Sequence, residues 1–275
     1  MSLRIQNNVE AFNAHRQLTA TSSKAAKAME RLSSGYRVNR AADDAAGLAI
    51  SEKMRSQIGG VAQAQRNAQD GVSLVQTAEG ALTEVHSMLQ RVRDLKVQSE
   101  NGTLNTDDKG AIEKEVIALG KEIGDIASQT KFNGIGLLDG GTASVSFQVG
   151  ANASEQITAS TASITSGTGM TAVVGTDGTS GKQIADLSIA EIDDAIKEVS
   201  TRRADLGAVQ NRLEHRLNNL GAYQENLTAS ESRIRDVDMA KEMVNFSKLQ
   251  ILSQAGTAML AQANQAPQGV LSLLR

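Results

Sequence analysis

Several residue types are scarce in this chain of 275 residues, and each scarcity excludes a class of protein. Cysteine is absent, which excludes disulfide scaffolds, thiolate metal sites and cysteine nucleophiles. Proline occurs once, at position 267, where an average composition would give roughly 14. Aromatic residues make up 2% of the chain and tryptophan is missing. We therefore expect an aliphatic, alanine-rich core and long helices that no proline interrupts.

Charge and hydropathy give no sign of a polyanionic or lipid partner. The formal net charge is −3, although residues 1–40 carry seven Lys or Arg against two Asp or Glu. No apolar run reaches the length of a membrane span. The first residues, MSLRIQNNVEAFNAH, have neither the apolar core nor the cleavage site of a secretion signal. The sequence predicts no membrane span, no nucleic-acid partner and, if the protein is exported, export without a cleaved signal peptide.

Apolar residues spaced by three and four predict two long helices. Residues 61–92 alternate between the two spacings throughout, and residues 192–234 carry a large aliphatic residue at every seventh position. Strict heptads indicate helices that lie nearly parallel with a slight supercoil. The positions that we expect to form the seam between them are Val75, Leu82, Val85, Leu89, Val92, Leu206, Leu213, Leu220 and Leu227.

Three further helices are predicted, at residues 3–32, 112–126 and 236–265. The last of these carries apolar groups on most sides, and no charged residue occurs from Leu249 to Leu274. A helix that is apolar all round has to be buried, yet its glutamines and asparagines argue against lipid. Packing between copies of the chain would bury it.

The middle of the chain changes character. Residues 130–140 contain the Asn-Gly and Asp-Gly signals of tight turns, and residues 144–150 alternate like a short strand. Residues 151–183 are dominated by Ser, Thr, Gly and Ala, which predicts hairpins and surface loops. The expected fold is mainly α: long helices pair the two halves of the chain in a coiled-coil-like rod, and a small β-hairpin insertion lies in the middle of the sequence.

No residue cluster resembles a catalytic site or a metal site. The histidines 15, 86 and 215 lie on separate predicted helices without metal-ligand spacing. The glycines 134, 136 and 140 do not match a phosphate-binding loop. The basic run from Arg91 to Lys96 is by default a solvated helix face. We expect no enzyme activity and no cofactor.

Long motifs on both sides of the insertion carry a resemblance to a known family. On the N-terminal side they are RLSSGYRVNRAADDAAGLAISEKMRSQI (31–58), DGVSLVQTAEGAL (70–82) and LQRVRDLKVQSEN (89–101). FQVGA (147–151) follows them, and LGAVQNRLEHRLNNL (206–220), SESRIRDVDMAKEM (230–243) and VLSLLR (270–275) lie on the C-terminal side. The sequence resembles bacterial flagellin over roughly residues 1–157 and 187–275, in a minimal form without large outer domains.

The resemblance implies a domain organisation. Residues 1–40 and 236–275 would form an inner coiled-coil core that polymerises, with a spoke loop at 33–43. Residues 44–140 and 187–235 would form a helical middle domain, and residues 141–186 an outward-facing insertion. The terminal segments would be disordered in the free monomer and would order on assembly. The residues implied in core polymerisation are Ile5, Val9, Phe12, Leu18, Leu32, Met243, Phe246, Leu249, Ile251, Leu252, Leu260, Leu271 and Leu274.

The resemblance also implies partners and a location. The chain would polymerise with itself into the extracellular flagellar filament after export through the flagellar type III channel. An export chaperone would bind its C-terminal helix, and the filament cap and hook-junction proteins would contact it. An innate immune receptor of animals would recognise Arg91, Leu95 and Glu115.

Other interpretations remain open from the residues alone. A hook–filament junction protein uses similar termini. An intracellular coiled-coil scaffold would form a stable dimer without filaments. A membrane-surface protein would use the basic N-terminal helix, although that segment has little bulky apolar surface.

Overall fold

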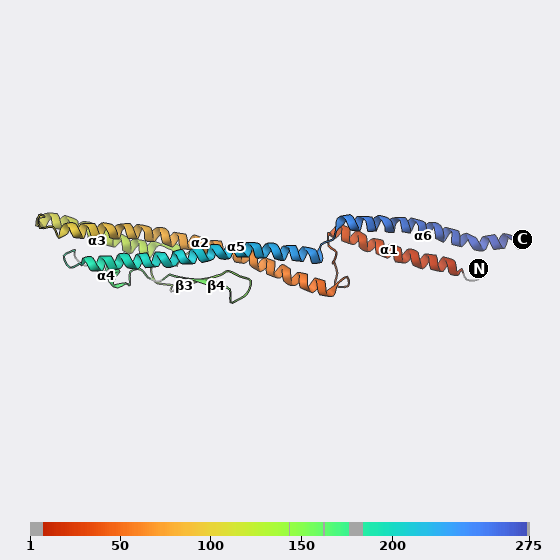
Figure 1. The fold of residues 1–275 in the computed structure, drawn as a ribbon, viewed down its shortest axis with the longest axis horizontal. Helices are drawn as coiled ribbons and strands as arrows, with labels where there is room; N and C mark the ends of the chain where they lie inside the picture. The colour runs from red at the N-terminus through yellow and green to blue at the C-terminus, as the bar shows by residue number, and fades with distance from the viewer. Residues whose placement is uncertain (1–7, 143, 162, 176–183, 274–275) are drawn as a thin grey trace. The chain divides into compact units, whose positions relative to one another are not determined.

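A computed structural model describes residues 8–142, 144–161, 163–175 and 184–273, and these are mainly helical (Figure 1). This confirms the predicted mainly α fold. The six helices of the described residues are α1 Val9–Ser34, α2 Ala45–Ser99, α3 Thr106–Gln129, α4 Thr168–Val174, α5 Ile189–Arg235 and α6 Met239–Leu273. The strands in the same residues are β1 Lys131–Phe132, β2 Ile135–Gly136, β3 Ser144–Gln148 and β4 Gln156–Ser160.

The chain divides into two compact units. Unit 1 combines residues 1–56 with residues 226–275, and unit 2 consists of residues 57–225. The predicted terminal segments 1–40 and 236–275 lie inside unit 1. Unit 1 additionally takes in the start of α2 and the end of α5.

Unit 2 holds one large aliphatic core between α2, α3 and α5. The seam residues from Val75 to Val92 on α2 share this core with Leu206 and Leu213 on α5. Leu220 packs in a smaller cluster with Val61 and Ala64. All of these side chains are buried because heptad spacing keeps them on one face of each helix.

Helix α3 begins at a complete capping box. The Asn105 side chain accepts a hydrogen bond from the Asp108 amide, and the Asp108 carboxylate accepts one from the Asn105 amide. These two bonds satisfy amides that the first turn of a helix leaves free. The capping box therefore fixes where α3 begins after the loop that follows α2, and α3 packs its apolar face on the unit 2 core.

Two short antiparallel hairpins follow α3. The first joins β1 to β2 through Asn133 and Gly134, whose φ angles are 49° and 81°. Positive φ at both central residues is typical of the type I′ turn that Asn-Gly favours. The second hairpin pairs β3 with β4 and places Phe147 opposite Ile157. Both the turn signal at 130–140 and the strand expected at 144–150 are confirmed.

The expectation that residues 151–183 form only hairpins and surface loops was wrong for their middle part. Helix α4 is almost entirely buried and adds Met170 and Val173 to the unit 2 core. Small residues make this possible: a Cβ on Gly169 would lie 2.5 Å from the backbone of α5, and one on Gly120 would lie 2.7 Å from the Val173 carbonyl oxygen. Residues 176–183 lie outside the described part of the chain.

In unit 1, α1 and α6 lie side by side (Figure 1). The Asn8 side chain donates a hydrogen bond to the Ala263 carbonyl oxygen, 2.7 Å away, and Gly256 lies against Leu18. The two helices are therefore antiparallel. Helix α1 ends at Ser34, and the next residue, Gly35, has a φ of 75°, which suits glycine after a helix C-terminus. Among the described helices, none is long and apolar enough to cross a membrane.

Candidate assembly surface

The α1–α6 pair exposes large apolar side chains instead of burying them. Phe12 on α1 is 71% exposed and Ile251 on α6 is 66% exposed. The buried apolar residues of these two helices, among those described, are Ala28 and Leu249. Soluble monomers seldom leave this many large apolar side chains uncovered on one pair of helices. We name it the assembly surface; its large exposed residues are Val9, Phe12, Met29, Met239, Met243, Val244, Ile251, Leu252 and Met259.

The residues implied in core polymerisation differ in their exposure. Val9, Phe12, Met243, Ile251 and Leu252 are exposed, and Leu249 is buried. The half-buried residues are Leu18, Leu32, Phe246 and Leu260, and Leu18 lies against Gly256 of α6. Ile5 and Leu274 lie outside the described residues, as does the side chain of Leu271, which belongs to α6.

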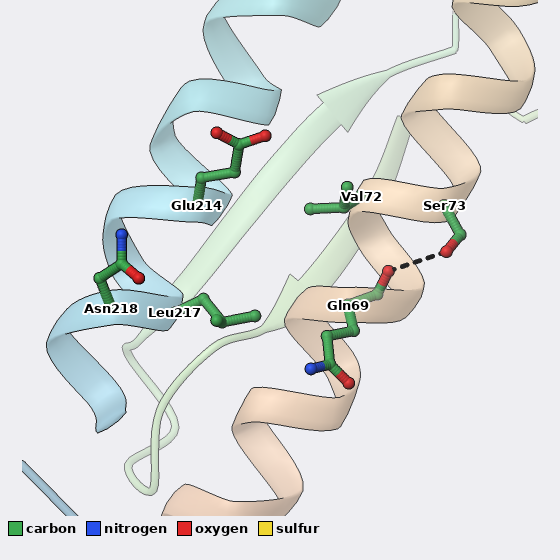
Figure 2. A pocket seen from close by; sticks show the side chains of 6 residues that line it. All are labelled: Gln69, Val72, Ser73, Glu214, Leu217 and Asn218. Atoms are coloured by element: carbon green, nitrogen blue, oxygen red, sulfur yellow. Dashed lines mark hydrogen bonds between the residues drawn. The ribbon is translucent and has the colours of Figure 1, made fainter. Parts of the chain in front are cut away.

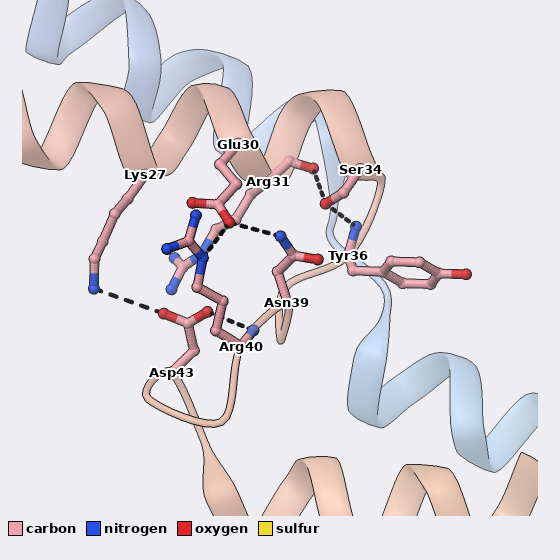
Figure 3. Close-up of polar contacts among 8 residues, drawn as sticks. All are labelled: Lys27, Glu30, Arg31, Ser34, Tyr36, Asn39, Arg40 and Asp43. Carbon is pink, nitrogen blue, oxygen red and sulfur yellow. Dashed lines mark hydrogen bonds and ion pairs between the residues drawn. The ribbon is translucent and has the colours of Figure 1, made fainter.

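The loop after α1 is held by a cluster of charged side chains (Figure 3). Glu30 accepts hydrogen bonds from Asn39, at 2.6 Å, and from Arg40, at 2.8 Å. Asp43 accepts one from the Arg40 amide and pairs with Lys27 at 3.6 Å. The hydrogen bond from Asn39, and then that from Arg40, lowers the pKa of Glu30, and the Arg40 amide does the same to the pKa of Asp43. Both carboxylates thus stay charged and tie the loop to α1.

Arg235 joins that loop to the connection between α5 and α6. Its guanidinium lies 4.6 Å from the centre of the Tyr36 ring and 2.7 Å from a Glu52 carboxylate oxygen. The Arg37 amide donates to the Arg235 carbonyl oxygen, and Tyr36 forms an isolated bridge with Asp236. These roles could not be predicted from the sequence, because nothing in the spacing of Tyr36 and Arg235 shows that they meet.

The middle-domain seam residues are buried in unit 2, with one exception. Leu227 is half-buried and belongs to unit 1. Ion pairs flank the seam: Arg93 lies 2.7 Å from Asp193, and Arg203 lies 3.8 Å from Glu79. The charged edges and the aliphatic seam together hold α2 against α5.

The structure brings together two of the three residues implied in receptor recognition. Arg91 and Glu115 form an exposed ion pair at 2.9 Å between α2 and α3. Leu95 is only 2% exposed and packs in the unit 2 core. One turn beyond Arg91, the Leu95 side chain points into the core, so the exposed part of the implied surface is the Arg91–Glu115 pair, and recognition by a receptor stays a prediction.

A shallow groove between α2 and α5 is lined by few side chains that could take part in catalysis (Figure 2). Val72 and Leu217 form its half-buried floor, and polar side chains form its rim. Its carboxylate, Glu214, accepts a hydrogen bond from Gln210 on the same helix. Within the described residues, no group of three or more His, Cys, Asp or Glu side chains could hold a metal ion. The groove is a feature of helix packing.

Comparisons with known proteins agree with the helical layout. Residues 5–143 match the family described as "Bacterial flagellin N-terminal helical region", and residues 189–274 match "Bacterial flagellin C-terminal helical region". The flagellin of Bacillus subtilis (strain 168) is 49% identical over 99% of this chain and 100% of its own length. The flagellin of Halalkalibacterium halodurans is 54% identical over 98% of this chain and 99% of its own.

A likeness to a junction-type protein is limited to the fold. A solved structure of a candidate flagellar hook-associated protein from Vibrio parahaemolyticus has a TM-score of 0.59 and is 15% identical, over 70% of this chain and 100% of that one. The identity to flagellins is much higher, and nothing supports a junction protein or an intracellular scaffold. The chain belongs to the bacterial flagellin family, whose members are structural proteins that polymerise into the extracellular flagellar filament.

Proposed function

We propose that unit 1 is the part of this subunit that drives polymerisation, and that neighbouring copies cover the assembly surface. The observation that carries this proposal is the exposure of large apolar side chains on α1 and α6. A fully buried Leu, Ile or Phe side chain gains about 1.5–3 kcal/mol relative to an exposed one. Several such side chains, each repeated in every copy, give polymerisation a large hydrophobic driving force.

A pair of substitutions tests this proposal. Phe12→Gln combined with Ile251→Gln removes two apolar groups that are exposed in the subunit, so the subunit keeps its fold. The matched control combines Val97→Gln with Ile117→Gln, which are exposed on unit 2. We expect the first variant to raise the critical concentration for seeded filament growth by more than about tenfold, which corresponds to about 1.4 kcal/mol per subunit added. The control should change it much less.

The readout is the protein that remains in the supernatant after filaments grown from seeds are sedimented. A chain that lacks residues 1–32 and 240–275 serves as the second arm and should form no filaments. Equal critical concentrations for the two Gln variants, or filaments from the shortened chain, would contradict the proposal.

We further propose that the export chaperone binds α6 before assembly. The helix exposes Ile251, Leu252 and Met259, and an apolar groove of a chaperone would cover such side chains. Co-purification of the chaperone with the native chain, and its loss on removal of residues 240–275, is the expected result. Cap and hook-junction proteins would meet the same surface at the filament ends.

Export through the flagellar type III channel without signal cleavage is also part of the proposed function, as is the absence of catalysis. Mass spectrometry of the N-terminal peptide from assembled filaments tests the first point, because a processed N-terminus would contradict it.

Recognition by an innate immune receptor is proposed for the surface around Arg91 and Glu115. The ion pair between them is exposed, and it offers a charged, hydrogen-bonding contact to a partner. Arg91→Ala should weaken capture of the chain by the receptor ectodomain. Undiminished capture would count against this surface.

A further inference from the structure

The methionines of this chain are unevenly distributed. Among the described residues, the exposed ones all lie on α1 and α6: Met29 is 51%, Met239 48%, Met243 50% and Met259 64% exposed. On α2, Met54 and Met88 are half-buried, and Met170 on α4 is fully buried.

The four exposed methionines belong to the assembly surface. The antiparallel pairing that joins Asn8 to Ala263 and Leu18 to Gly256 places Met29 at about the level of Met243. Met239 starts α6, and Met259 lies just past the middle of this 35-residue helix. Methionine side chains are therefore spread along the assembly surface. Neighbouring copies cover this surface under the proposal above.

We propose that Met29, Met239, Met243 and Met259 are oxidation sites through which peroxides block polymerisation of the free subunit. This inference rests on the proposed role of unit 1 in assembly. In each step hydrogen peroxide transfers one oxygen atom to the thioether sulfur. The sulfur is oxidised to the sulfoxide, a new S–O bond forms, the O–O bond breaks, and the peroxide is reduced to one molecule of water.

The composition directs this chemistry to methionine. The chain has no cysteine and no tryptophan, so the thioether is its most readily oxidised side chain. Oxidation rates follow exposure, which favours the four sites on α1 and α6 over Met88 and Met170. A sulfoxide is polar and chiral, and it disrupts apolar contacts that the thioether would make.

The consequence depends on the state of the subunit. In the free chain the four side chains face solvent, so their oxidation leaves the fold of unit 2 unchanged. In the filament a sulfoxide would have to be buried without a hydrogen-bond partner, and this opposes addition of the oxidised subunit. Filaments that have already formed cover the sites and should resist the same treatment.

The test begins with the full-length native monomer and limited hydrogen peroxide. Peptide mass spectrometry measures the sulfoxide at each methionine, and sedimentation measures the critical concentration for growth on seeds. We expect the four sites to oxidise before Met88 and Met170, and the critical concentration to rise by at least about tenfold, because each buried sulfoxide leaves a polar group unpaired. Unchanged growth with all four sites oxidised would overturn the inference, as would faster oxidation of Met170.

Two further arms link the effect to these residues. A variant with Met→Leu at positions 29, 239, 243 and 259 should polymerise after peroxide treatment, because leucine has nearly the same volume and does not oxidise. Met54→Leu with Met88→Leu is the matched control and should stay sensitive. Equal sensitivity of the two variants would contradict the inference.

If the fourfold Met→Leu variant does not polymerise even before peroxide treatment, enzymatic reduction of the oxidised native chain tests the inference instead. Methionine sulfoxide reductases of both stereospecificities should restore growth, and failure to restore it after complete reduction would refute the inference. The untreated native monomer separates the two proposals: if it does not extend seeds, the proposed assembly function itself is wrong.

Discussion

At the residue scale, Glu155 connects the β3–β4 hairpin to α5. Its carboxylate lies 3.1 Å from the Arg216 guanidinium, and it accepts a hydrogen bond from the Asn152 amide at 3.1 Å. Arg216 also donates to the Val149 carbonyl oxygen at 2.9 Å. The Asn152 amide contributes most to lowering the pKa of Glu155 below its usual 4.5, and Arg216 adds to the effect.

The lowered pKa predicts a pH dependence of the hairpin. A carboxyl group whose pKa falls on folding stabilises the native state above its unfolded pKa, and the contribution is lost as pH falls through the folded pKa. The protection of the hairpin amides, corrected for the intrinsic exchange rate at each pH, should therefore fall below about pH 4.5. Glu155→Gln should exchange faster at neutral pH and lose this acid dependence. Glu225→Gln, at an exposed position of the same helix as Arg216, is the control, and an unchanged acid response in Glu155→Gln would contradict the assignment.

The burial of the seam in unit 2 predicts how a single core substitution changes stability. Leu82 is completely buried in the large core, so Leu82→Ala removes apolar contacts and leaves a cavity. We expect the free energy of unfolding of unit 2 to fall by about 2–5 kcal/mol. Val97→Ala, at an exposed position of the same helix, should cost less than about 0.5 kcal/mol. Chemical denaturation followed by circular dichroism compares them, and similar losses would argue against the seam as the core.

At the element scale, docking of α4 depends on glycine. A Cβ at Gly169 would lie 2.5 Å from the Glu191 carbonyl oxygen and from the Ala195 amide nitrogen, both backbone atoms of α5. A Cβ at Gly221, on α5, would have no atom of another residue within 4 Å beyond its own stretch of helix. Both glycines are helical, so the substitution to alanine gains the same helix propensity at each.

The two glycines should respond to alanine in opposite directions. Gly221→Ala should stabilise the subunit by about 0.5–1 kcal/mol, because alanine has the higher helix propensity. Gly169→Ala should lower stability, since α4 has to move away from α5 and expose Met170 and Val173. Thermal unfolding of the monomers measures both shifts. A stabilising Gly169→Ala would show that α4 does not pack closely there.

The long helices could be predicted from the sequence because each one carries its own periodic signal. Apolar spacing alone located α2, α3 and α5, and Asn133 with Gly134 marked the first hairpin. Helix α4 could not be found in this way, because its seven residues are too few for a period and its docking depends on distant glycines. The link between Tyr36 and Arg235 was missed for a related reason: it joins residues far apart in the chain.

At the scale of the whole molecule, the two units differ in how much apolar surface each one buries. The buried apolar side chains of unit 1, among the residues described, are Ala28, Val38 and Leu249. Unit 2 contains the large core that runs along α2, α3 and α5. Ordering the backbone costs about 1–2 kcal/mol per residue. Three buried apolar side chains cannot offset that cost over two helices as long as α1 and α6.

The free subunit should therefore show two levels of stability. We expect the amides of α1 and α6 to exchange with solvent far faster than those of α2 and α5 in the unit 2 core, because local opening there exposes little additional apolar surface. Polymerisation should slow exchange in α1 and α6 strongly, since neighbouring copies add the missing apolar contacts and couple ordering to assembly. Hydrogen exchange read by mass spectrometry on monomer and filament measures both, with the unit 2 core as the internal reference. Strong protection of α1 and α6 in the free monomer would mean that unit 1 is stable alone, and that assembly joins subunits that are already folded.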